Sequence, residues 1–520
     1  MTKQTQFVKG TLILAIGGLI AKVLGGVFKI PLTLMVGDVG VGYYGYAYPL
    51  YSLMTSLAII GIPSSLAKIL SQYQAAKKYD EIYIIFKYAR NLMFIVGIIL
   101  STIIFVSTPY LVNLLGWEDD AKYCMFAIAL CPVFICVMGA YRGYFQAFNN
   151  MSPIAISQFI ENIIRVIAGL SLAYFLLPNI GLASGGATFG SVIGAMCGLV
   201  WLIIYGNKHI IKPTNIKANL NFIATSKTIF KFAIPIAIGS AMIAIISIID
   251  AILVTQCLVN NGKSLEEATI LFGQITKTNT LVNLPSTFGI AIVMNLIPTI
   301  THAIEARQSK LIEQKLNLAL QLTFIIALPA MAGLITLALP IMEFVYQDHL
   351  MNMNILRISA LTIPVMMISQ VLSGILQGIG SIWTPVYALC IASIAKTILT
   401  YIFIGTNLEI LGAPLASVIS YTIIIIFNYY YIKKDTKINL AWFSLISKPL
   451  FTSIIMVIIT HLTYINLTTS QALSTIISIG VGALVYGVLI IYFDKTLQQN
   501  LIQLKRENNN GKKSRRNART

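Results

Sequence analysis

The chain has 520 residues, of which 57% are hydrophobic and only 10% carry a charge. Soluble proteins contain about 25% charged residues, so the composition excludes an ordinary soluble enzyme and predicts a polytopic membrane protein. The formal net charge of +18 would fit nucleic-acid binding, but the positions of the basic residues argue against that partner.

The first apolar run covers about residues 7–36 and contains two lysines, Lys22 and Lys29. It is longer than the core of a signal peptide, so we expect a retained membrane helix. A spacing of seven places both ammonium groups on one helix face, roughly 10 Å apart. Because a cation in hydrocarbon costs at least ~2.5–3.5 kcal/mol, the pair predicts a protein-lined, aqueous interior that receives an anion. Snorkelling is the alternative, and it suits Lys29 better than Lys22.

Hydropathy predicts fourteen membrane spans in all. They are expected to be helices, because backbone groups in lipid need hydrogen-bond partners within their own segment. The expected spans are 7–36, 43–70, 83–107, 121–147, 153–177, 183–205, 228–258, 268–301, 316–340, 350–376, 382–405, 409–432, 443–465 and 472–493.

The loop charges give an orientation for these spans. If the N-terminus is cytoplasmic, the seven outer loops hold a single basic residue, Lys263, whereas acids such as Asp38 gather there. The inner loops and the C-terminal segment carry the remaining loop lysines and arginines. This positive-inside pattern predicts a multi-pass protein of the cell membrane with both termini in the cytoplasm.

An internal repeat divides the predicted spans. The matching residues are Gly45 and Gly61 with Gly273 and Gly289 at a shift of 228, Gly143-x-x-Gln146 with Gly374-x-x-Gln377 at a shift of 231, and Gly186-Ala187 with Gly412-Ala413 at a shift of 226. Their common order indicates a duplication. Each copy has six spans, so the copies keep the same orientation and are related by an axis along the membrane normal.

The expected fold is therefore an all-α polytopic membrane protein with two six-helix lobes in a pseudo-two-fold repeat and two extra C-terminal helices. We expect an N-terminal lobe at 1–205, a basic cytoplasmic linker at 206–227 and a C-terminal lobe at 228–434. The extra helices fall within 435–495. The polar, basic tail at 496–520 is expected to be disordered and to touch anionic lipid headgroups, with no nucleic acid as partner.

Charged side chains inside the spans are the main candidates for function. They are Lys22, Lys29, Glu161, Arg165, Asp250, Lys277, Arg357 and Lys396. Because six of these eight are cations, they favour an anionic substrate, and phosphate suits both lysine and arginine. Lys277 shares a polar stripe with Thr280 and Asn283, which fits either a cavity wall or hydrogen bonds between helices.

The other candidates have two interpretations each. Glu161 and Arg165 are four residues apart and are expected to pair within one helix. Asp250 is either a proton or cation site or the partner of an interior lysine. Arg357 and Lys396 either line a cavity or neutralise acids on other helices.

Catalytic and metal-binding motifs are missing from the sequence. It contains no P-loop, HExxH or GxSxG motif, and none of the six cysteines has a metal-ligand spacing. We therefore expect neither enzymatic activity nor a metal or cofactor, and the sequence leaves Na⁺, H⁺ and the membrane potential open as the driving force. Lys68, near the cytoplasmic end of the second span, is an interfacial anchor or an inner-mouth substrate contact.

Several short motifs resemble a known family. They are Lys22-Val-Leu-Gly25 with Lys29-Ile-Pro31, Gly42-Tyr-Tyr-Gly45 with Tyr48-Pro49-Leu-Tyr51-Ser52, Gly61-Ile-Pro63 with Lys68, and Leu281-Val-Asn283-Leu-Pro285. In this order they are similar to polysaccharide-biosynthesis flippases of the stage V sporulation protein B type, in the multidrug/oligosaccharidyl-lipid/polysaccharide exporter superfamily. The likeness extends to about residue 495.

The resemblance implies an undecaprenyl-diphosphate-linked saccharide as substrate, with the peptidoglycan precursor lipid II as the first candidate. It would move from the inner to the outer leaflet by alternating access through a cationic central cavity. Lys22 matches a basic position of the lipid II flippase group, whereas arginines of that group fall near Thr55-Ser56 and Thr280 here. The implied partners are the lipid-linked oligosaccharide, membrane lipids and cell-wall synthesis proteins.

Three alternatives remain open at this stage. A cation-coupled multidrug exporter of the same superfamily would favour an acid-rich cavity, and a membrane glycosyl- or acyltransferase would need a loop-borne cluster of acids or histidines. A non-transporting scaffold for wall or spore assembly would tolerate neutralisation of Lys22, Lys29 and Lys277 together.

Overall fold

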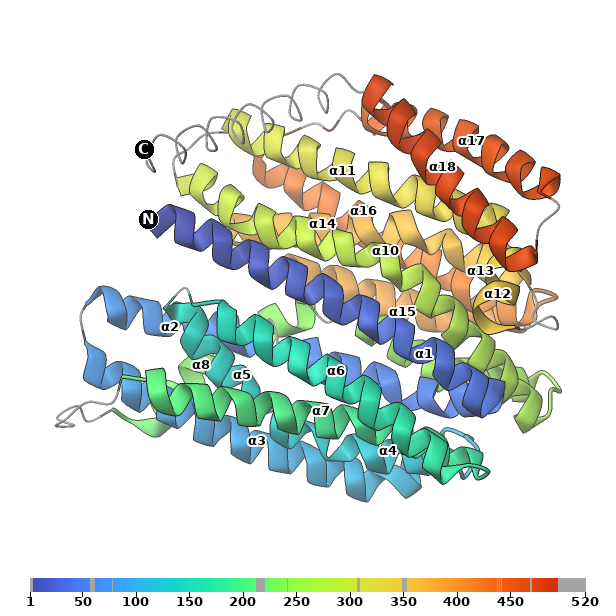
Figure 1. Ribbon diagram of the computed structural model, residues 1–520. Helices are drawn as coiled ribbons and strands as arrows, with labels where there is room; N and C mark the ends of the chain where they lie inside the picture. Colours follow the sequence, from blue (N-terminus) through green and yellow to red (C-terminus); the bar gives the residue numbers. More distant parts are fainter. Residues whose placement is uncertain are drawn as a thin grey trace, which may run out of the picture.

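In the computed structural model the chain forms a bundle of long helices that run roughly alongside one another (Figure 1). The structure describes residues 3–56, 61–76, 78–148, 150–211, 220–240, 242–305, 309–347, 353–436, 438, 440, 442–467 and 470–493. For residues 3–24 the description covers the backbone alone. No strand occurs in these described ranges.

The helices follow the expected spans in order. They are α1 (Lys3–Ser56), α2 (Ile62–Ala75), α3 (Tyr79–Leu114), α4 (Ala121–Ala129), α5 (Cys131–Ala147), α6 (Ser152–Leu176), α7 (Ile180–His209), α8 (Phe222–Ser240), α9 (Met242–Asn260), α10 (Leu265–Glu305), α11 (Ser309–Thr336), α12 (Ala338–Tyr346), α13 (Met353–Ala360), α14 (Thr362–Ile379), α15 (Thr384–Ile404), η2 (Glu409–Leu411), α16 (Gly412–Thr436), α17 (Trp442–Asn466) and α18 (Gln471–Phe493).

These helices confirm the all-α polytopic fold with fourteen spans. Ten stretches of the described chain are long and apolar enough to cross a membrane, and the other spans lie in α1, α2 and α8–α10. Several spans consist of two helices: α4 and α5 meet at Leu130, two residues before Pro132, because a proline inside a helix removes one backbone hydrogen bond.

A single glycine makes the turn between the first two spans. Gly37 interrupts α1 with φ 65° and ψ −169°, a backbone conformation that side-chain-bearing residues rarely adopt. We call the end of the bundle that carries this turn the Gly37 end. Lys68, near the other end of the second span in α2, lies toward the opposite end of the bundle.

Helix packing confirms the repeat. Gly143 of α5 packs without space for a side chain against Leu66 of α2, and its repeat partner Gly374 of α14 packs in the same way against Val293 of α10. The second pair of matches behaves alike: Gly186 contacts Leu172 on α6, and Gly412 contacts Phe403 on α15. Equivalent glycines therefore make equivalent helix contacts in the two lobes.

Helix α1 lies between the two groups of helices in Figure 1, with α3–α7 on one side and α10, α14 and α16 on the other. The extra helices α17 and α18 pack on each other and on α11 at the outer edge. Their outward faces carry exposed apolar side chains, among them Ile458 and Val488, as expected for surfaces in contact with lipid.

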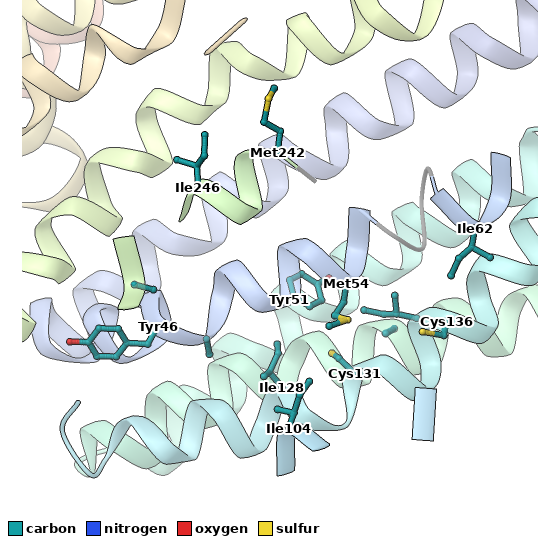
Figure 2. Packing of buried hydrophobic residues seen from close by; sticks show 14 of the residues in the cluster. Tyr46, Tyr51, Met54, Ile62, Ile104, Ile128, Cys131, Cys136, Met242 and Ile246 are labelled. Atoms are coloured by element: carbon teal, nitrogen blue, oxygen red, sulfur yellow. The ribbon is translucent and has the colours of Figure 1, made fainter. Parts of the chain in front are cut away.

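Buried apolar side chains fill the bundle around α1. Figure 2 shows Tyr51 and Met54 of α1 close to Cys131 of α5, within a continuous cluster that also includes Met242 and Ile246 of α9. The expected lobe and linker boundaries stay predictions. The linker is described only up to residue 211 and from 220, and the tail at 496–520 lies outside the described residues.

Candidate functional site

The charged residues inside the spans form three separate clusters, one in each lobe and one between them. The first cluster is in the N-terminal lobe, where Arg142 of α5 pairs with Glu161 of α6 at 2.9 Å. Both side chains are buried, with 1% and 2% of their surface exposed. The expected pairing of Glu161 with Arg165 within α6 is therefore wrong, because Arg142 on the neighbouring helix reaches the carboxylate instead.

Arg165 has no carboxylate in hydrogen-bond contact among the described residues. Its Nη1 donates to the hydroxyl of Tyr51 at 3.4 Å, and that hydroxyl donates to Oε1 of Glu161 at 3.2 Å. Its Nε is buried and has no hydrogen-bond partner in the described structure. The guanidinium lies against the backbone of α1, since a Cβ added at Gly25 would be 2.7 Å from Nη2.

Lys29 completes this group, which we call the N-lobe cluster: Lys29, Tyr51, Arg142, Glu161 and Arg165. Lys29 is half-buried, and its ammonium lies 4.4 Å from the ring centre of Tyr48. Arg165 lies 5.7 Å from the ring centre of Tyr51. Aromatic faces attract cations without neutralising them. The cluster therefore holds more positive than negative charge, with one acid against three cations.

The second cluster joins the two lobes near the Gly37 end. Lys277 of α10 forms an ion pair with Asp38 of α1, and only 4% of Lys277 is exposed. The two helices approach closely because Gly273, one turn before Lys277, packs against the carbonyl of Asp38. Tyr46 continues the contact by stacking on Phe272 of α10 at 4.8 Å. We call this region the inter-lobe contact.

The third cluster lies within the C-terminal lobe. Lys396 of α15 is fully buried and forms an ion pair with Asp250 of α9 at 2.6 Å. Its ammonium also donates to the carbonyl of Ala413 at 3.0 Å and to the hydroxyl of Ser417, both on α16. Asp250 was expected to be an ion site or the partner of a lysine, and Lys396 to line a cavity or neutralise an acid. The structure shows that the two residues pair with each other. We call Asp250 and Lys396 the C-lobe pair.

A small cavity of about 30 Å³ borders the C-lobe pair. Asp250 lines it together with Asn283 of α10 and Tyr421 of α16. A polar space of this size accommodates one or two water molecules. Asn283 thus faces the C-terminal lobe, whereas Lys277 on the same helix pairs with Asp38 of the N-terminal lobe.

Four further candidates are not members of the three named clusters. Lys22 belongs to α1, three residues before Gly25, and its side chain is outside the described part. Thr280 is buried and its hydroxyl donates to the carbonyl of Thr276 in its own helix. Lys68 and Arg357 are exposed, and Arg357 contacts Asn354 at 3.5 Å within its own helix, α13. Arg357 therefore neither pairs with a described acid nor faces the cavity.

Sequence reasoning missed two members of these clusters, Arg142 and Asp38. Arg142 precedes the repeat glycine Gly143 inside an expected span, and that position was the signal by which it could have been found. Asp38 was assigned to an outer loop, although the turn at Gly37 directs the following residues into the next span. Among the described residues, no group of three or more His, Cys, Asp or Glu side chains could hold a metal ion.

The fold and the charged interior define a multi-pass membrane transporter of the multidrug/oligosaccharidyl-lipid/polysaccharide type. The model of the polysaccharide biosynthesis protein family matches residues 7–304, and the MatE model matches residues 269–402. The chain belongs to the polysaccharide biosynthesis protein family, which confirms the resemblance stated from the sequence.

Curated relatives from Bacillus subtilis include the lipid II flippase MurJ, 28% identical with 83% of each chain covered. The stage V sporulation protein B of the same organism is 25% identical over 95% of this chain and 96% of its own. Among solved structures, a lipid II flippase MurJ in an inward closed conformation matches with a TM-score of 0.69 at 20% identity, covering 94% of this chain and 99% of its own. An inward-facing MATE multidrug transporter matches with a TM-score of 0.65 at 13% identity, covering 82% of this chain and all of its own.

Proposed function

We propose that the protein is a flippase that moves an undecaprenyl-diphosphate-linked saccharide, lipid II first among the candidates, from the inner to the outer leaflet of the cell membrane. The two lobes would alternate between inward-open and outward-open states around a cationic cavity. The charge pattern of the loops supports cytoplasmic termini, so the Gly37 end would be the outer end.

The surplus of positive charge in the three clusters carries this proposal. Each acid of the clusters has its own cation: Asp38 with Lys277, Glu161 with Arg142, and Asp250 with Lys396. Lys29 and Arg165 are left with tyrosine rings and a hydroxyl as their described contacts. A diphosphate headgroup supplies the negative charge that such a site lacks, and its passage through hydrocarbon is prohibitive without a polar route.

The inter-lobe contact supports alternating access. Gly273 and Lys277 hold α10 against α1 at the Gly37 end, so a cavity between the lobes would be closed there in this conformation. Opening that end would break the ion pair and separate the glycine contact. The substrate would then be exposed to the other leaflet by a rotation of one lobe against the other.

A multidrug exporter is the second candidate, because solved MATE transporters share this fold. A cationic drug would need an acid that is free to meet it. The charge pairing speaks against that function, since the carboxylates of the three clusters already have lysine or arginine partners. A scaffold without transport gives no reason for buried cations that lack acids.

Depletion of the protein in cells tests the proposal. The proposed flippase predicts that an undecaprenyl-diphosphate-linked precursor accumulates on the inner leaflet, identified by mass spectrometry and by its protection from an externally added modifying enzyme. Re-expression of the wild-type chain should restore the outer-leaflet precursor, and a Lys29→Ala, Arg165→Gln variant that still inserts should not. Unchanged precursor distribution in depleted cells without paralogues would refute the proposal.

A further inference from the structure

The hydroxyl of Tyr51 stands between two opposite charges of one helix. Glu161 and Arg165 are four residues apart on α6, a spacing at which a carboxylate and a guanidinium can pair directly. Instead, the hydroxyl donates to Oε1 of Glu161 at 3.2 Å and accepts from Nη1 of Arg165 at 3.4 Å. Because Tyr51 belongs to α1, a residue of a neighbouring helix separates a pair that α6 could form by itself.

The remaining contacts of these two side chains hold the charges apart. Arg142 of α5 donates to the other carboxylate oxygen of Glu161, Oε2, at 2.9 Å. The guanidinium of Arg165 lies 5.7 Å from the ring centre of Tyr51, and its Nη2 would be 2.7 Å from a Cβ added at Gly25. Tyr51 therefore contacts Arg165 through both its ring and its hydroxyl, and the cation is directed to the first span.

Burial makes a direct ion pair the natural alternative to this arrangement. Tyr51, Glu161 and Arg165 are all buried, so water does little to screen the attraction between the two charges. Without the hydroxyl, Nη1 of Arg165 would lose its acceptor, and Nε of Arg165 already lacks a hydrogen-bond partner in the described structure. Glu161, one turn earlier on the same helix, would then be within reach of the guanidinium.

We propose that Tyr51 is a positioning residue that keeps Arg165 off Glu161 and directs the guanidinium to the face of α1 at Gly25. Two arrangements follow. While Tyr51 is in place, Arg165 presents its charge to the first span; when the second span moves away from α6, Arg165 pairs with Glu161 and its charge is neutralised. A movement of α1 against α6 thereby switches an interior cation on and off. That this charge serves lipid movement rests on the proposed function, whereas the exchange of partners does not.

The structure of a Tyr51→Phe variant of the full chain tests the exchange directly, because phenylalanine keeps the ring and removes the hydroxyl. We expect the guanidinium of Arg165 to leave Gly25 and to lie within ion-pair distance of Glu161. Tyr141→Phe is the matched control, since it removes the hydroxyl of another buried tyrosine of the N-terminal lobe, on α5, and should leave Arg165 in place. A Tyr51→Phe structure in which Arg165 stays against Gly25, apart from Glu161, would overturn the proposal.

A charge-selective label measures the same change in detergent solution. A cysteine in place of Lys29, one turn after Gly25 on the same face of α1, is treated with an anionic or a cationic methanethiosulfonate of similar size. The ratio of the two rates reports the local potential, because effects on the thiolate itself cancel. Tyr51→Phe should lower the anionic-to-cationic ratio on the order of threefold or more, since a neighbouring cation is neutralised. Tyr141→Phe should leave it unchanged, and the chain without the added cysteine gives the background of the native thiols.

Glu161→Gln separates the positioning role from general damage to the fold. It should raise the ratio more in the Tyr51→Phe chain than in the chain that keeps Tyr51, because only in the former does the acid hold Arg165. Equal effects of Glu161→Gln in the two chains, or an unchanged ratio in Tyr51→Phe, would overturn the proposal. If Tyr51→Phe shows the exchange while the wild-type chain moves no lipid in vesicles, the positioning role stands and the flippase function falls. If Arg165 keeps its place in Tyr51→Phe while the wild-type chain moves lipid, the positioning role falls and the flippase function stands.

Discussion

The C-lobe pair gives the sharpest prediction about stability. Lys396→Met removes the ammonium and leaves the carboxylate of Asp250, which is 8% exposed, without its cation. Asp250→Asn does the reverse and leaves the fully buried ammonium with the neutral oxygens of Ala413 and Ser417. Removing one partner of a buried ion pair costs about 3–5 kcal/mol, because the other charge stays uncompensated.

The double variant Asp250→Asn, Lys396→Met should cost far less than the sum of the two, because replacing both partners with neutral groups of similar size is often close to neutral. The expected coupling free energy in a double-mutant cycle is therefore several kcal/mol, because the two single losses share one cause. Because the entropy of unfolding is about 2.1 cal/mol/K per residue, a chain of 520 residues melts roughly 1 °C lower per kcal/mol lost, so each single variant should melt roughly 3–5 °C lower.

Thermal unfolding in detergent, followed by fluorescence-detected size-exclusion chromatography, measures the three variants against the wild type. Additive losses in the double variant would show that Asp250 and Lys396 do not interact and would refute the reasoning. The same double variant also tests whether Asp250 couples transport to an ion. Transport should persist if Asp250 only neutralises Lys396, whereas loss of transport in a folded double variant would indicate that Asp250 is the ion-coupling acid.

Further predictions concern the inter-lobe contact, the N-lobe cluster and the tail. Gly273→Leu should separate α10 from the Asp38 carbonyl and raise labelling of a cysteine introduced at Thr269 by a membrane-impermeant maleimide severalfold. Gly480→Leu is the control, because an added Cβ there meets nothing within 4 Å. Equal labelling in both variants would contradict the close packing at Gly273. Glu161→Gln should lower stability by about 3–5 kcal/mol, since Arg142 would stay buried without its carboxylate; an unchanged melting temperature would show that Arg142 finds another partner. Truncation after residue 495 should change transport in vesicles less than twofold, and loss of transport would give the tail a direct role.

The fold could be predicted from the sequence because the apolar runs, the loop charges and the repeat all indicated the same arrangement of spans. Apolar runs of the right length marked the spans, and the loop lysines gave them a consistent orientation. The glycines of the repeat were informative because two helices can approach closely where a residue has no side chain. Gly143 and Gly374 are two such contact points. Hydropathy predicted the break after residue 36 but expected a loop at 37–42, whereas in the structure Gly37 alone is non-helical and the helix resumes directly after it.

The pairing of charges could not be predicted in the same way. The spacing of Glu161 and Arg165 gives information only about contacts within their own helix. The partner of Glu161 is Arg142, which lies 19 positions earlier in the chain, on α5. Lys277 meets Asp38 because the Gly273 contact brings two lobes together, and sequence spacing carries no information about that approach. The presence of buried cations was thus predictable, and their partners were not.

Reconstitution of the purified chain in vesicles with a fluorescent undecaprenyl-diphosphate-linked disaccharide tests the flippase function most directly. The label on the outer leaflet is quenched by a membrane-impermeant reductant, and the fraction that becomes accessible is followed in time. The flippase predicts that the protected half of the lipid becomes accessible with the wild-type chain and stays protected with the Lys29→Ala, Arg165→Gln variant. Equal protection in wild-type and protein-free vesicles, under an imposed membrane potential and with Na⁺ and pH gradients, would contradict it.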